Sequence, residues 1–220
     1  YRWTDKLRSQ HRFDLLDINY IYVPWKSNMF KQYLENLTDR NSILIKSYED
    51  QLIVRTGYTY TYNSAGNIKN TSRNSFTIRF NVEESGNLLN VASKLLHLKS
   101  NGENEYEIAN IPFAQYVKGD FDFAQIIRID NRNSLAFHVG MGIAYPYGNS
   151  KALPFEKRYF SGGPNSVRGW SVRSLGPGNY KGSDNGMTYI NHTGDIKLDL
   201  NIEYRTRLFW KFNGAAFIDA

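Results

Sequence analysis

The sequence predicts an all-β fold, specifically a transmembrane antiparallel β-barrel, from three observations. Apolar and polar residues alternate with a period of two along several long segments, which is the pattern of strands with one apolar face. Aromatic residues are abundant, with 16 Tyr and 13 Phe among 220 residues. No run of about eighteen apolar residues is present, so no transmembrane helix is predicted, whereas barrel strands give only a weak alternating signal.

The strands can be assigned in chain order. The clearest is the sixth, where Ile, Leu and Tyr alternate strictly with Lys, Asp, Asn, Glu and Arg. The last segment has Asp219 on its polar side if Ala215 and Phe217 share that side. The predicted strands are Phe13–Val23, Gln51–Tyr62, Phe76–Glu83, Val117–Ile129, Leu135–Tyr147, Ile196–Arg205 and Lys211–Ala220.

The segments between these strands are less regular. Arg2–Arg12 is predicted to be a charged connection, Met29–Leu37 fits a short helix, and Asp130–Asn133 fits a tight turn. The apolar pattern of Leu88–Leu98 fits both a strand and a helix and leaves the two open. Topology favours a strand, because the short turn at Glu84-Ser85-Gly86 and the orientation of the next two strands require one extra crossing. Residues 1–220 form one barrel domain, and the patterns at Tyr1–Trp3 and Phe217–Ala220 suggest that both ends are cut from a longer barrel.

Strand length and the placement of tyrosines favour a membrane barrel over a soluble sandwich. Several alternating runs reach about ten to fourteen residues, whereas sandwich strands usually have about five or six. Tyr58, Tyr60 and Tyr62, and again Tyr145 and Tyr147, cluster towards strand ends as in the aromatic girdles of barrels. The opposite faces carry full charges, which suits a wet lumen. The rival is a soluble carbohydrate-binding β domain, which would leave the first three tyrosines in water.

Other classes of function have little support. The net charge is +6, but Lys and Arg are spread along the chain without the clustered footprint of a nucleic-acid-binding protein. Zero Cys excludes thiolate metal sites, and the four His show no ligand spacing; His138 is expected to be a hydrated residue on a polar face. No G-x-S-x-G or complete dinucleotide motif is present. We therefore predict no enzyme, no cofactor and no metal.

One long loop, residues 148–192, stands out because loops of this length are usually functional or disordered. Its aromatic residues, which include Tyr159, Phe160 and Trp170, argue against disorder because they are costly to leave in water. Two glycines, a proline and an Arg-Gly pair suggest a loop that folds onto the sheet and places one cation. The motif residues are Gly162, Gly163, Val167, Arg168, Gly169 and Trp170.

The motif Val167-Arg168-Gly169-Trp170, after Gly162-Gly163 and before Ser174-Leu175-Gly176-Pro177, resembles the BamA/TamA family of outer-membrane assembly barrels. Together with Tyr58–Asn63, the chain is most similar to the TamA-like lipoproteins of Bacteroidetes. The resemblance covers about Phe13 to Ala220. It implies a sixteen-stranded barrel preceded by periplasmic POTRA domains, of which this chain would be the C-terminal half without the last strands. Trp170 departs from the family's usual Phe or Tyr.

The resemblance also implies a role for the loop arginine. In this family the loop folds into the lumen, and its Arg pairs with acids on the next two strands, which by motif position are Glu203 and Asp219. Alternation independently places Glu203 on a polar face. A guanidinium offers a rigid fork that two carboxylates can share. Three glycines would let the backbone turn and approach the barrel wall: Gly162, Gly163 and Gly169.

The function implied is insertion or export of client proteins at the bacterial outer membrane. Partners would be client outer-membrane proteins, outer-membrane lipid and an inner-membrane-anchored TamB-like protein that binds the missing periplasmic domains. The barrel seam, outside this chain, would open or thin the bilayer, and client strands would pair with its edge. The alternatives are a two-partner-secretion transporter and a passive outer-membrane pore.

Overall fold

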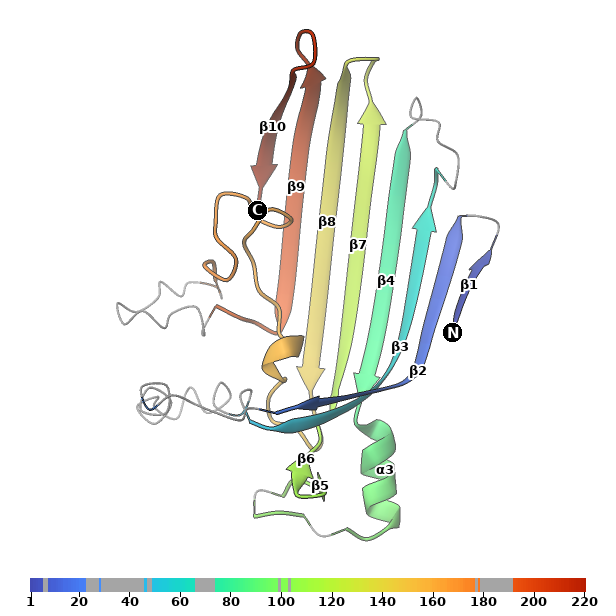
Figure 1. Ribbon diagram of the computed structural model, residues 1–220, viewed down its shortest axis with the longest axis vertical. Helices are drawn as coiled ribbons and strands as arrows, with labels where there is room; N and C mark the ends of the chain where they lie inside the picture. The colour runs from blue at the N-terminus through green and yellow to red at the C-terminus, as the bar shows by residue number, and fades with distance from the viewer. Residues whose placement is uncertain are drawn as a thin grey trace.

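The computed structural model describes residues 1–5, 8–22, 28, 46, 49–65, 74–98, 100–102, 104–176, 178 and 192–220. Figure 1 shows one tall, curved sheet with a long loop along one side and a helix at one end. The helix predicted for Met29–Leu37 lies outside the described residues. No helix in the described part is long and apolar enough to span a membrane.

In the described part of the chain, eight strands form one antiparallel sheet in the order β1-β2-β3-β4-β7-β8-β9-β10. Each strand after the first pairs with its predecessor in this order, so the sheet is a simple meander. A second, two-stranded sheet contains β5 (Glu107–Ile108) and β6 (Ile111–Pro112). The main strands are β1 (Arg2–Asp5), β2 (Ser9–Ile21), β3 (Gln51–Asn63), β4 (Ser75–Ser85), β7 (Tyr116–Arg128), β8 (Asn133–Pro146), β9 (Ile196–Arg207) and β10 (Asn213–Asp219).

The all-β, antiparallel prediction is confirmed, and two local predictions are wrong. Arg2–Arg12 is not a connection, because β1 and the start of β2 form a hairpin there. Leu88–Leu98 is not a strand: α3 (Asn87–Leu95) begins after Gly86, whose φ of 82° ends β4. The topological reason for a strand fails because β4 and β7 pair directly, so no extra crossing is required.

The two ends of the sheet differ in their connections. Residues 22–50, 86–115 and 147–195 connect strands at one end, which we call the loop end and which lies at the bottom of Figure 1. Residues 6–8, 64–74, 129–132 and 208–212 connect strands at the other, the turn end. The connections at the loop end are therefore much longer than those at the turn end.

The two faces of the sheet are exposed in the opposite way from those of a water-soluble protein. On the apolar face, Ile196 is 72% exposed and Leu198 is 56% exposed. On the polar face, Asp199 is 3% exposed and Glu83 is 5% exposed. Water-soluble proteins seldom expose large contiguous apolar surfaces, and they bury charges only when these are paired. The sheet is therefore built to place its apolar face outside water and its polar face under other parts of the chain.

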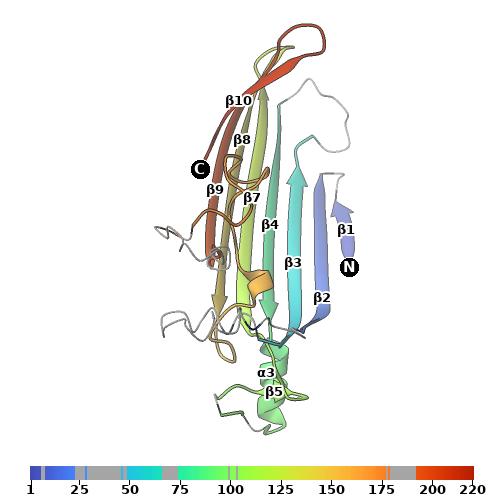
Figure 2. The ribbon, with the colours of Figure 1, turned by 60° about the vertical axis from the view of Figure 1, so that its left-hand side comes forward.

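A small apolar core lies at the loop end. The fully buried side chains of Ile53 and Tyr116 pack there with Ala114, Ala144 and Leu153. The β2–β3 pair curves across this end of the sheet, as both views show (Figure 1, Figure 2). The curvature brings the beginning of β3 against the segment before β7, where the amide of Ala114 donates to the carbonyl of β3 residue Leu52 at 2.8 Å.

Candidate functional site

The described part of the loop between β8 and β9 lies against the polar face of the sheet. It leaves β8 through the 3-10 helix η2 (Phe155–Lys157) and then runs beside β9 towards the C-terminus (Figure 1, Figure 2). Its two ends are joined near the sheet, where the amides and carbonyls of Tyr159 and Gly194 exchange two hydrogen bonds of 2.8 Å. The remainder of the loop thus starts from a fixed base.

The motif itself folds into consecutive tight turns. The amide of Trp170 donates to the carbonyl of Val167 at 3.1 Å, and the amide of Gly163 donates to the carbonyl of Trp170 at 2.8 Å. Gly162 and Gly163 both have φ of 95°, a left-handed conformation that glycine adopts without steric cost. A Cβ atom on Gly162 would lie 2.2 Å from the carbonyl oxygen of Ser171. The glycine pair therefore allows the turn that presents the next residues to the sheet.

Arg168 reaches the sheet and contacts two acids. We call these three residues, Arg168, Glu203 and Asp219, the tip site. Its Nε and Nη2 donate to the two carboxylate oxygens of Asp219, each at 2.7 Å. Its Nη1 donates to Glu203, and its backbone amide donates to Asp219 at 3.1 Å. The guanidinium also lies 3.6 Å from the ring centroid of Phe217, which shares the polar side of β10 with Asp219. The arrangement uses the planar fork of arginine, which a lysine cannot reproduce.

Neighbouring polar groups complete the tip site. The amide of the Asn201 side chain donates to Asp219 at 2.9 Å and to the carbonyl of Ser166 at 2.8 Å. The hydroxyl of Ser166 donates to Asp199 at 3.1 Å, and Asp199 pairs with Lys197 at 2.7 Å. As a result the side chain of Asp219 is only 4% exposed yet fully paired.

The charge state of Arg168 is fixed by these contacts. The hydrogen bonds from its guanidinium to Asp219, and then to Glu203, raise the pKa of Arg168 above its already high ordinary value. The arginine therefore remains a cation at every physiological pH, and the tip site cannot act as a proton switch through this residue.

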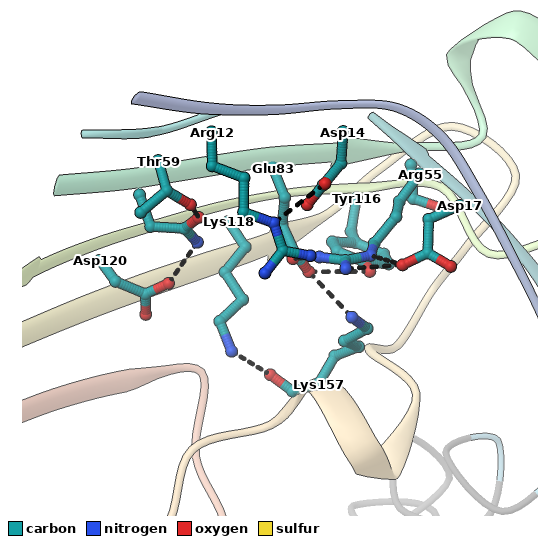
Figure 3. A network of polar contacts seen from close by, with 12 residues as sticks. Arg12, Asp14, Asp17, Arg55, Thr59, Glu83, Tyr116, Lys118, Asp120 and Lys157 are labelled. Carbon is teal, nitrogen blue, oxygen red and sulfur yellow. Dashed lines mark hydrogen bonds and ion pairs between the residues drawn. The ribbon is translucent and has the colours of Figure 1, made fainter. Parts of the chain in front are cut away.

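A second set of contacts fixes the beginning of the loop, and we call it the root site (Glu83, Asp120, Lys157 and Tyr159). Figure 3 shows its acidic centre, Glu83. One carboxylate oxygen of Glu83 forms an ion pair with Lys157 at 3.1 Å, and the other forms an ion pair with Arg55 at 2.6 Å. The hydroxyl of Tyr116 donates to Glu83 at 3.0 Å. Arg55 also pairs with Asp17 of β2 at 2.6 Å. The loop base is thus connected through charged groups to β2, β3, β4 and β7.

Tyr159 provides the other half of the root site. Its hydroxyl donates to Asp120 at 2.5 Å, and the ammonium of Lys118 lies 4.1 Å from its ring centroid. Burial of the ring, followed by the hydrogen bond to Asp120, raises the pKa of Tyr159, so the phenol stays neutral. The ring lies over Gly142, where a Cβ atom would come within 2.5 Å of it. Glycine at position 142 therefore makes room for the tyrosine on β8.

The structure brings together some of the sequence-predicted site residues and not others. Arg168, Glu203 and Asp219 meet, and Gly162 and Gly163 form the turn. Gly169 does not need to be glycine by the same reasoning, since its φ is not positive and a Cβ there would meet nothing within 4 Å. Trp170 is 52% exposed, so the described part of the chain does not cover this aromatic side chain.

Sequence reasoning missed the root site. The polar faces were interpreted as solvated, whereas Glu83 is buried and bound to two cations. His138 is likewise not merely hydrated, because its ring nitrogens contact Asp122 at 2.8 Å and Asn201 at 2.7 Å. One signal in the sequence could have indicated the root site. Lys157 and Tyr159 lie just before the glycine pair, and the polar faces of the strands contain acids with which they could pair. Among the described residues no group of His, Asp or Glu is arranged to hold a metal ion.

These features define a class: an all-β protein whose antiparallel sheet exposes its apolar face and covers its polar face with one of its own loops. The model of the Omp85 superfamily domain matches residues 7–220, so the chain belongs to that superfamily. Members of the superfamily are outer-membrane protein insertion and secretion factors, an assembly and transport role rather than catalysis, and membership implies the bacterial outer membrane. A search of curated proteins found no match.

Proposed function

We propose that this chain is the barrel part of an outer-membrane factor that inserts or exports client proteins, with the β8–β9 loop as a brace inside the barrel. The observation that carries the proposal is the paired contact of Arg168 with Glu203 and Asp219 on adjacent strands. A passive pore needs only a wet, charged interior. A guanidinium that binds acids on two adjacent strands does more, because it holds one loop at a defined position on the barrel wall.

The shape of the sheet supports the barrel. Outer-membrane barrels have long loops at one end, short turns at the other, and an apolar band facing lipid. The loop end, the turn end and the exposed apolar face correspond to these features. Closure of the sheet follows from the membrane environment, because an edge facing lipid would leave backbone groups unpaired. The polar face is then the wall of the lumen, and the described part of the loop after β8 lies inside it.

The loop would act by holding the sheet in one curvature while client strands pair with an open edge of the barrel. Such pairing is β-augmentation, in which backbone hydrogen bonds supply affinity for an extended segment. The motif and the Tyr58–Asn63 run further favour a protein of the TamA-like lipoprotein type. On that basis periplasmic POTRA domains would precede this chain, and a TamB-like inner-membrane-anchored protein would be the partner. The complete barrel, of which this chain would be a part, would have sixteen strands.

The experiment compares Arg168→Ala, Arg168→Lys and wild type in the full-length protein, using surface display or assembly of client proteins in cells as the readout. We expect assembly to fall in both variants, because lysine keeps the charge but loses the fork on Asp219. Barrel content of the membrane, measured by heat-dependent migration in gels, should remain in both. Client assembly at the wild-type level in Arg168→Ala would refute the proposed role of the loop and favour a passive pore.

A two-partner-secretion transporter remains the second candidate because it shares the loop motif. Deletion of this protein separates the two functions. Loss of a single secreted partner with unchanged assembly of other outer-membrane proteins would favour the transporter, whereas loss of several outer-membrane proteins supports the assembly factor.

A further inference from the structure

The turn between β9 and β10 is unusually apolar for a short connection. Its five residues, Leu208–Phe212, contain three aromatic rings and one lysine. Phe209 is 68% exposed and Trp210 is 75% exposed. The rings contact one another, with centroids of Phe209 and Phe212 at 5.2 Å and those of Trp210 and Phe212 at 6.3 Å. We call Leu208–Phe212 the aromatic turn.

The backbone of the aromatic turn favours a smaller residue than the one it carries. Trp210 has φ of 51°, the left-handed region where Gly and Asn are common and a bulky side chain is an outlier. The turn is nevertheless well formed, because the amide of Phe212 donates to the carbonyl of Phe209 at 2.9 Å and the amide of Leu208 donates to that of Phe212 at 3.0 Å. A tryptophan placed under strain and exposed to the surroundings indicates a role for its side chain outside this chain.

Several cations lie around the aromatic turn. From Arg205 to Asn213 the sequence has Arg205, Arg207 and Lys211 and no Asp or Glu. Arg205 pairs with Glu203, whereas Arg207 and Lys211 make no ion pair with the described residues. Arg132 of the adjacent turn lies beside them, since its carbonyl accepts the amide of Arg207 at 2.9 Å. Asp130 of that same turn is an acid close to Arg132, whose amide donates to its carboxylate at 2.6 Å. The positive charge that remains without an acidic partner is therefore that of Arg207 and Lys211.

The aromatic turn continues the apolar face of the sheet. Leu208 leans over Gly214, where a Cβ atom would lie 3.3 Å from its Cδ1, so the side chain is on the apolar side of β10. On the same side, Tyr204 is the last aromatic residue of β9 and Ile218 is exposed on β10. Along this side the apolar face is followed first by exposed aromatic rings and then by cations. This order matches the layers of a bilayer, in which hydrocarbon is followed by the interface and then by anionic headgroups.

We propose that the aromatic turn is a lipid-binding element that inserts into the interface of the bilayer, with Arg207 and Lys211 contacting anionic phospholipid headgroups. The inference rests on the proposed membrane barrel, because it takes the apolar face as the lipid-facing side. A protein partner is the other conceivable occupant. The continuity with the apolar face and the uncompensated positive charge favour lipid.

The test places an environment-sensitive fluorophore at single cysteines of the full-length protein in vesicles of phosphatidylcholine with or without phosphatidylglycerol. This chain has no native Cys that would react. The probe sites are Phe209→Cys in the aromatic turn, Asn131→Cys in the adjacent turn, and Leu200→Cys in the middle of the apolar face. Quenching is compared between nitroxide lipids labelled near the headgroup, nitroxide lipids labelled near the chain end, and a water-soluble quencher.

We expect the probe at position 209 to be quenched most by the headgroup label, and the probe at 131 by the water-soluble quencher. Anionic nitroxide lipid should quench position 209 more than zwitterionic lipid, and Lys211→Gln should reduce that preference roughly fivefold, as removal of one basic residue near an anionic surface predicts. Access of position 209 to the water-soluble quencher equal to that of position 131 would overturn the inference and indicate a site for protein. If the probe at 200 also fails to meet the chain-end label, the membrane barrel itself is wrong.

Discussion

The root site makes the most specific prediction, which concerns the pair of Glu83 and Lys157. Replacing Glu83 with Gln keeps the shape of the side chain and its hydrogen bond from Tyr116 but removes the negative charge. Arg55 still has Asp17, so the group left without an acidic partner is Lys157. The effect should therefore appear at the base of the loop, rather than across the whole sheet.

The magnitude follows from the burial of the pair. The nitrogen and oxygen are 3.1 Å apart, and the side chains are only 16% and 6% exposed for Lys157 and Glu83. A hydrogen bond between charged groups contributes about 1.5–3 kcal/mol. We take about 2 kcal/mol, because the long lysine side chain can move its ammonium towards water. At about 1.4 kcal/mol per factor of ten, local opening of the loop base should become roughly thirtyfold more frequent.

Hydrogen exchange of the full-length protein measures this opening, since the amides of Tyr159 and Gly194 are both bonded across the loop base. Glu83→Gln and Lys157→Met should each accelerate exchange there, and the double variant should add little to either. The control is Glu156→Gln, which makes the same charge change on an exposed neighbour of Lys157. Effects of the two single variants that simply add, within about 0.3–0.5 kcal/mol, would show that the pair does not hold the loop.

Three further predictions use the same full-length protein. Arg168→Lys should raise exchange at the amide of position 168 roughly tenfold, the effect of losing one charge-assisted hydrogen bond; no change would mean that the fork contributes nothing. Gly142→Ala should displace the ring of Tyr159 and accelerate exchange at the loop base, whereas Gly119→Ala should not, because a Cβ there meets only a backbone oxygen at 4.0 Å. Hydrogen bonds from the side chain of Asn133 and from backbone amides lower the pKa of Asp130 in the β7–β8 turn. Its folded value therefore lies below the unfolded one. The contribution of this carboxylate to turn stability is complete above the unfolded value of about 3.9 and is lost as pH falls through the folded value. Turn-amide exchange, corrected for intrinsic rates, should show this loss in wild type and not in Asp130→Asn.

The sequence predicted the strands well because alternation reports which face of a strand is apolar, whatever solvent that face meets. Ile196–Arg205 was assigned from alternation alone, and the observed β9 (Ile196–Arg207) extends two residues further. Leu88–Leu98 shows the limit of this signal. Its apolar spacing fits both periods, and the choice depended on how β4 connects to β7, which is a long-range property.

Site residues were predictable only where a motif identified them. Glu203 and Asp219 follow from motif position and alternation together, but Glu83 lies 74 positions before Lys157 in the numbering, and nothing local couples them. The decisive fact, that the loop covers this part of the polar face, depends on the sheet order and on the curvature of β2 and β3. Alternation identifies a polar face, but it does not distinguish a solvated face from one covered by another part of the same chain.

The two sites restrain the sheet in a way that neither does alone. The root site holds the loop to β4 and β7, and the tip site holds it to β9 and β10, and Arg168 is only nine positions after Tyr159 in the chain. Adjacent strands lie about 4.8 Å apart, so the strands held at the two sites are separated by several spacings and move relative to each other when the sheet changes curvature. Hydrogen bonds tolerate little of that movement. The contacts of one site must therefore break before those of the other when the sheet changes curvature. Arg168 donates through three guanidinium nitrogens and its amide, whereas Lys157 and Tyr159 each depend on a single acid. We therefore expect the root site to open first, and exchange at the amide of Tyr159 should precede exchange at the amide of Arg168; the reverse order would mean that the curvature of the sheet is controlled at the tip.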